Sequence, residues 1–230
     1  MRSLILISLF LSFSLKASEL SPWLVLSDEV IKLESNSSFR KIPASILIES
    51  GSKWDEKKTL LRSLEKTQQS LGQCGLSLGE VRIQVIKFHP GVLEDMVATS
   101  PYHPPGILKL LKGNDLPDVR PLFFLIGRKT ERSAFAMNRR AVEVYRRSHP
   151  HAGVERMLNV SLLTDHYTTN SYVPSASESY DTFAHELVHL LTNDGHKELK
   201  YNLMSTFEGP NMQTGDLVQA QCKQMENFPH

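Results

Sequence analysis

The chain has little of the features that mark specialised protein classes. Two cysteines in 230 residues exclude a disulfide-dense extracellular scaffold. The 26 basic and 25 acidic residues nearly balance at a net charge of +1, which leaves no basic surplus for nucleic acid or an anionic membrane surface. There is no internal repeat and no low-complexity linker. With 40% hydrophobic residues, the composition is typical of a globular protein with one domain or two small lobes sharing a cleft.

Long apolar runs are also scarce, and the one at the N-terminus is too short for a comfortable membrane span. Arg2 precedes this run at Leu4–Leu15, and Ala17 is a small residue at which a signal peptidase would cut. We expect residues 1–17 to be a secretory signal peptide, with a buried N-terminal helix as the alternative. Cleavage would change the net charge from +1 to about −1, because residues 1–17 carry two basic side chains. The sequence therefore predicts a secreted or periplasmic protein without stable membrane insertion after cleavage.

The two cysteines, Cys74 and Cys222, lie at opposite ends of the mature chain. Export makes a disulfide chemically possible, and a bond between them would close a long loop. We expect this disulfide, and the alternative is two separate buried thiols.

The remaining chain predicts alternating strands and helices in a single domain. Residues 18–41 are polar and weakly patterned, so we expect an N-terminal arm or a short pro-segment, followed by one domain at residues 42–230. Residues 89–120 are rich in Pro and Gly and predict a long irregular segment of the functional kind. Helices are expected at residues 54–71 and near the C-terminus, and strands at residues 42–49, 81–88, 121–126, 133–137 and 157–163.

Residues 182–191 read TFAHELVHLL and carry the clearest chemistry. They belong to an expected helix with Ser177 or Ser179 as its N-cap. On a helix, His185 and His189 lie one turn apart on the same face, where two imidazoles can share one tetrahedral zinc ion. Glu186 is then placed to accept a proton from a metal-bound water. The alternative is an ordinary pair of histidines on a buried helix.

A zinc site of this kind needs a third protein ligand, with the fourth position open for water. His196 stands seven residues after His189, beyond an Asn-Asp-Gly turn that can bring it back toward the metal. Glu198 and Glu208 are rival third ligands and rank below His196. Met204 follows in YNLMS and can form an apolar floor under the histidines.

The pattern from His185 to Met204 resembles that of the metzincin clan of zinc metallopeptidases, whose motif is HExxHxxGxxH followed by a Met-turn. The resemblance implies zinc ligands at His185, His189 and His196, one zinc per chain, a catalytic base at Glu186 and a Met-turn at Met204. This sequence departs from the motif because its glycine, Gly195, comes late and its third histidine lies one residue further along.

The resemblance also implies a fold and an activity. The fold class is α/β (α+β), with a mixed twisted sheet and two backing helices in an upper lobe, and a small irregular lower lobe with a C-terminal helix. In this layout Cys74–Cys222 would tie the two lobes together on the side away from the zinc. The activity would be that of a monomeric zinc endopeptidase that binds protein or peptide substrates along the edge strand at residues 133–137. The alternatives are a catalytically inert, zinc-stabilised binding module and a metal-free structural protein with an accidental motif.

Overall fold

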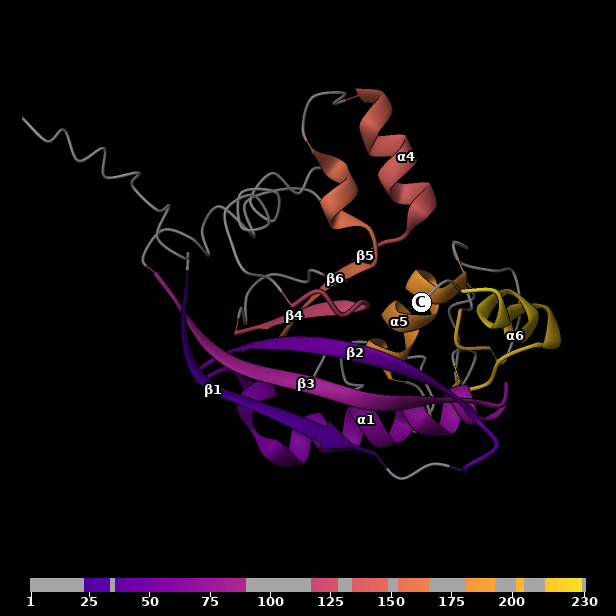
Figure 1. The fold of residues 1–230 in the computed structure, drawn as a ribbon, viewed down its shortest axis with the longest axis horizontal. Helices are drawn as coiled ribbons and strands as arrows, with labels where there is room; N and C mark the ends of the chain where they lie inside the picture. Colours follow the sequence, from indigo (N-terminus) through magenta and orange to yellow (C-terminus); the bar gives the residue numbers. More distant parts are fainter. Residues whose placement is uncertain are drawn as a thin grey trace, which may run out of the picture.

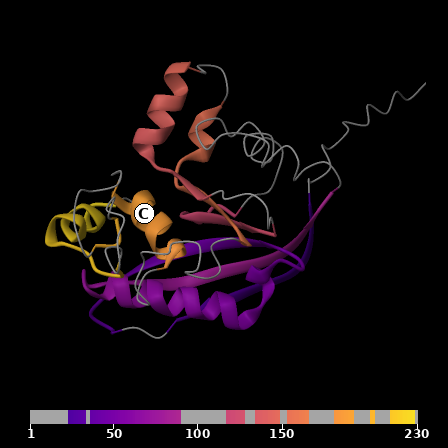
Figure 2. The same ribbon diagram turned by 180° about the vertical axis from the view of Figure 1, so that it is seen from behind.

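A computed structural model shows a mixed six-stranded sheet with helices on both faces (Figures 1 and 2). It describes residues 23–33, 36–89, 117–127, 134–148, 153–165, 181–192, 202–204 and 214–228. The strands are β1 (Trp23–Lys32), β2 (Arg40–Glu49), β3 (Leu76–Phe88), β4 (Leu122–Ile126), β5 (Ala134–Met137) and β6 (Val160–Thr164).

The strand order is β1-β3-β2-β4-β6-β5. The four central strands run parallel, whereas each edge strand, β1 and β5, runs antiparallel to its neighbour. Parallel strands need crossover connections, and α1 provides the one between β2 and β3. The predicted edge strand at residues 133–137 is confirmed as β5, at the end of the sheet beside β6.

The described helices are short and amphipathic or buried. They are α1 (Lys57–Gly72), α4 (Arg139–Ser148), α5 (Thr182–Thr192) and α6 (Gln219–Glu226), with 3-10 turns η1 (Lys53–Asp55) and η2 (Val154–Met157). None of these helices is long and apolar enough to cross a membrane. Figure 1 shows α1 and α4 on opposite faces of the sheet, and α6 beside α5.

Two apolar clusters fill the two faces of the sheet. β4 shows the division, because Phe123 and Leu125 join the cluster under α1, α5 and α6, while Phe124 joins the one under α4. Phe123 stacks on Phe183 of α5, with ring centroids 4.2 Å apart. Helix α5 therefore packs on the part of the sheet formed by β4, β6 and β5 and is flanked by α1 and α6, which explains why every residue of it except His189 is buried.

The fold class predicted from the sequence is confirmed. α1 and α5 pack on the same face as the two expected backing helices, and the expected C-terminal helix is α6. Two elements were missed. One is α4, whose apolar stripe is only Ala141, Val142 and Tyr145, between two exposed basic pairs, Arg139-Arg140 and Arg146-Arg147.

The other missed element is β1, which lies in the segment expected to be an arm or pro-segment. Asp28 on this strand accepts hydrogen bonds from Arg82 and Gln84 on β3. The bonds from Arg82 hold the pKa of Asp28 at about 2. Residues 24–30 of this strand are all exposed, so its sequence lacks the apolar–polar alternation by which a half-buried strand is recognised. The register also skips from Val25 to Ser27 at a bulge.

Candidate metal centre

Helix α5 begins at a buried aspartate. One oxygen of the Asp181 carboxylate accepts hydrogen bonds from the backbone N–H groups of Phe183, at 2.9 Å, and Ala184, at 3.3 Å. Its other oxygen accepts the Ser63 hydroxyl of α1 at 2.9 Å. Asp181 is therefore the N-cap, and the prediction that the helix starts at Ser177 or Ser179 is wrong. Those two serines lie outside the described residues. The buried Ser63 hydroxyl of α1 favours a cap at Asp181, because it donates a hydrogen bond to that carboxylate.

Replacement of Asp181 by alanine tests the cap. Asp181→Ala removes the oxygen that accepts two N–H groups at the start of α5, so we expect the free energy of unfolding to fall by about 1–2 kcal/mol. Asp181→Asn keeps an accepting oxygen and is expected to lose much less. Urea unfolding of both variants measures the difference, and equal losses would contradict the capping role.

The asparagine variant also tests the charge. Burial raises the pKa of Asp181 to about 6 in the folded protein, whereas an unfolded aspartate titrates near 3.9. The folded state thus holds the proton more tightly, and this contribution to stability is lost as pH rises from about 4 to about 6. Between pH 4 and pH 7 the stability of Asp181→Asn relative to wild type should rise by roughly 2–3 kcal/mol. A difference that does not change with pH would contradict the shift.

The two histidines of the motif converge on one point. The Nε2 atoms of His185 and His189 are 3.1 Å apart, and their rings are nearly perpendicular, at 86°. Two nitrogens bound to one tetrahedral zinc at about 2.0–2.1 Å are separated by about 3.3–3.4 Å. The pair therefore fits two corners of a zinc tetrahedron. Without metal, the same distance suits an N–H···N hydrogen bond from His189 to His185.

The tautomer of His185 is fixed by the turn at residues 202–204. Its Nδ1 lies 2.7 Å from the Leu203 carbonyl oxygen. A carbonyl only accepts, so Nδ1 carries the hydrogen and the Nε2 lone pair points toward His189. This is the arrangement that metal-binding histidines adopt, with the far nitrogen held by a carbonyl or carboxylate.

Glu186 lies between the histidines in sequence and is 6% exposed. Burial raises its pKa to about 8. A nearby dication would oppose this shift and favour the carboxylate. A buried carboxyl group whose pKa is near neutrality is suited to accept and return a proton.

Met204 is buried in the apolar cluster that also contains Phe183 and Val188 of α5. Its backbone N–H donates to the side chain of Asn202 at 2.9 Å, which closes the turn. Met204 thus lies in a turn that shares an apolar cluster with the motif helix. Its role as a floor under the histidines stays a prediction.

The third ligand stays a prediction. His196, Glu198 and Glu208 all lie outside the described residues. Within the described ranges, no group of three His, Cys, Asp or Glu side chains is arranged to hold a metal ion.

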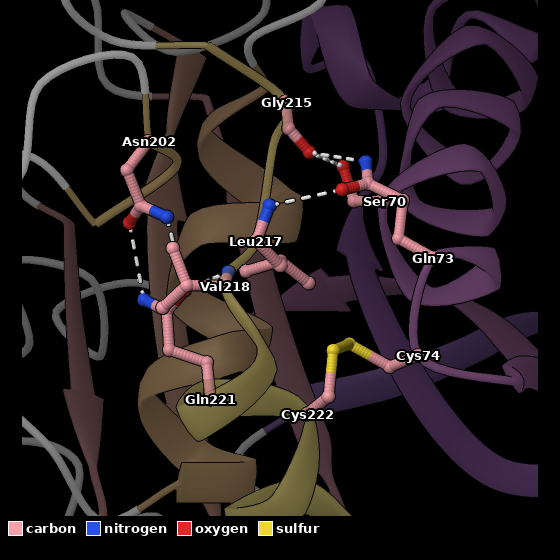
Figure 3. Close-up of a disulfide and its surroundings, with 9 residues drawn as sticks. All are labelled: Ser70, Gln73, Cys74, Asn202, Gly215, Leu217, Val218, Gln221 and Cys222. Atoms are coloured by element: carbon pink, nitrogen blue, oxygen red, sulfur yellow. Dashed lines mark hydrogen bonds between the residues drawn. A yellow bond between two sulfur atoms is a disulfide. The ribbon is translucent and has the colours of Figure 1, made fainter.

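The disulfide expected from the sequence is present. Cys74, just after α1, and Cys222 in α6 are bonded, with their Cα atoms 4.9 Å apart (Figure 3). The disulfide joins α6 to the C-terminal end of α1. It connects segments 148 residues apart in the sequence.

Sequence reasoning missed a second residue that holds the motif helix. The Asn138 side chain donates to the His189 carbonyl at 3.0 Å and accepts the Ala141 N–H at 2.9 Å. It therefore caps α4 and fixes the C-terminal half of α5 beside the end of β5. An asparagine directly before a helix is a recognisable cap signal, but nothing in the sequence indicates its contact with α5.

Comparison with solved structures places the fold. The chain is similar to the crystal structure of metalloproteinase-II from Bacteroides fragilis, with a TM-score of 0.52 and 14% sequence identity. The similarity covers 87% of this chain and 57% of that one, so this chain spans little more than half of that protein's length. No protein-family model and no curated protein matches by sequence. The likeness shows a metalloproteinase-like fold.

Proposed function

We propose that this protein is an exported zinc endopeptidase with a metzincin-like site. The observation that carries the proposal is the convergence of the His185 and His189 Nε2 atoms at 3.1 Å, with the His185 tautomer set by Leu203. The fold similarity to a metalloproteinase supports it independently. Zinc would be held by His185, His189 and His196.

In the proposed mechanism of peptide hydrolysis, different residues of the chain have different roles. Zinc held by these histidines would supply a Lewis acid for the scissile carbonyl and for the attacking water. Glu186 would accept a proton from the attacking water and donate it to the leaving amine. A peptide substrate would pair with the outer side of β5, because an antiparallel edge strand offers unpaired backbone groups. Asn138 follows β5 directly and holds α5 in place beside it.

The proposal includes the cellular setting. Residues 1–17 serve as a signal peptide, and the Cys74–Cys222 disulfide suits an oxidising compartment outside the cytosol. The near-neutral charge favours protein or peptide substrates over nucleic acid. We propose a monomer with one zinc site.

Zinc content tests the ligand set. We expect one zinc per chain in the purified mature protein by elemental analysis, and clear loss in His196→Ala, because a two-histidine site leaves the metal weakly held. His89→Ala makes the same change at an exposed histidine directly after β3, so it is the matched control and should keep its zinc. Zinc retained in His196→Ala would assign the third ligand elsewhere. No zinc in the wild type, even after reconstitution, would refute the proposal.

A further inference from the structure

Two buried amide side chains bind each other behind the turn at residues 202–204. Asn202 donates to the Gln221 side-chain oxygen at 3.0 Å, and Gln221 donates back to the Asn202 oxygen at 3.1 Å (Figure 3). Both are almost fully buried, at 1% and 2% exposure. Amides sealed from water hold their geometry, because breaking either bond leaves polar groups unsatisfied.

The remaining bonds of this amide pair extend in two directions. The Asn202 oxygen also accepts the Met204 N–H, which closes the turn around Leu203. The Gln221 oxygen also accepts the Val218 N–H at 2.8 Å, where α6 begins. Leu203 is held from its other side, since its N–H donates to the Asp216 carbonyl at 2.8 Å. The Leu203 carbonyl, which accepts a hydrogen bond from His185, is thus held in direction by α6 together with the segment that leads into it.

The segment that leads into α6 is itself fastened to α1. The Gly215 carbonyl oxygen accepts hydrogen bonds from the Ser70 hydroxyl at 2.8 Å and from the Gln73 side-chain amide at 3.0 Å. Gln73 also accepts the Leu217 N–H at 3.0 Å. The Cys74–Cys222 disulfide closes the same interface, with Cys222 one residue beyond Gln221 (Figure 3). α6 is therefore held firmly against α1, and its bond through Gln221 can hold the turn at residues 202–204 in one position.

We propose that Gln221 is a positioning residue that sets the tautomer and ring orientation of His185 through Asn202 and the Leu203 carbonyl. The inference rests on the proposed function, because its consequence is tight metal binding. Partners that orient a metal-binding histidine typically account for 10–100-fold in metal affinity. Gln221 acts one bond further out, so we expect its loss to weaken zinc binding by about 10-fold.

The test compares Gln221→Met, which keeps most of the side-chain volume, with Gln224→Ala, which removes an exposed glutamine from the same helix. Zinc affinity is measured by competition with a chromophoric chelator. The His185 tautomer is measured in zinc-free protein by long-range ¹H–¹⁵N correlation, and circular dichroism checks folding. We expect a single Nδ1–H tautomer in the wild type and in Gln224→Ala. Gln221→Met should show mixed tautomers and about 10-fold weaker zinc binding.

A double-mutant cycle with Asn202→Ala separates positioning from the capping bond to Val218. If Gln221 acts through Asn202, Gln221→Met should change zinc affinity less than twofold in the Asn202→Ala background. Additive losses would overturn the proposal, and so would a Gln221→Met protein with wild-type tautomer and affinity. A wild type with the Nδ1–H tautomer and no zinc binding would refute the zinc peptidase while the positioning role stands.

Discussion

Glu186→Gln should hydrolyse a quenched fluorescent protein substrate about 10²–10⁴ times more slowly than the wild type, the contribution usual for a general base. The glutamine has nearly the same shape but does not accept the proton of the attacking water. Zinc content should be unchanged, because the proposed ligands are the neighbouring histidines. Folding should be preserved or improved, since burial opposes the charged form of Glu186.

The control is Glu143→Gln, which makes the same change on an exposed residue of α4 and should leave turnover unchanged. Three outcomes are informative. Near-wild-type turnover in Glu186→Gln would remove this residue from the mechanism. Loss of zinc together with activity would make Glu186 part of the metal site. A wild type that binds zinc without hydrolysing any substrate in a broad screen would favour the inert binding module.

The sequence predicted what depends on local spacing. His185 and His189 lie four residues apart, and a helix places them on one face whatever surrounds it. The spacing of four leucines likewise predicts α1, namely Leu60, Leu61, Leu64 and Leu71. Three of them are buried, whereas Leu61 is partly exposed. The edge strand β5 and the buried strand β4 follow from short apolar runs.

What the sequence did not predict depends on contacts between distant residues. By residue type, three positions are good N-caps for α5: Ser177, Ser179 and Asp181. Asp181 is the cap because its carboxylate also accepts a hydrogen bond from Ser63, which lies 118 residues away in the sequence. β1 was missed because its residues 24–30 are all exposed, so it lacks the alternation of a half-buried strand. Asn202 and Gln221 come from different segments and bind each other, and nothing in the sequence indicates that either polar side chain is buried.

Removal of the disulfide should give the largest change in stability. Cys74 and Cys222 are 148 residues apart, and the loop-entropy relation assigns about 5 kcal/mol to closing a loop of that length. Native bonds usually contribute somewhat less, so we expect Cys74→Ser/Cys222→Ser to lower the free energy of unfolding by about 3–5 kcal/mol. Urea unfolding of the zinc-free proteins measures this without a contribution from metal binding.

The same variant connects stability to the site. α6 carries both Cys222 and Gln221, and without the disulfide its approach to α1 would depend on non-covalent contacts such as the hydrogen bonds of Gly215 and Leu217. We therefore expect the folded double-serine protein to bind zinc more weakly than the wild type, with the mixed His185 tautomers predicted for Gln221→Met. Wild type reduced and alkylated after folding is the control that leaves the sequence unchanged and should behave alike. A double-serine protein within 1 kcal/mol of the wild type in stability, with an unchanged His185 tautomer, would mean that the α1–α6 interface holds without the covalent bond.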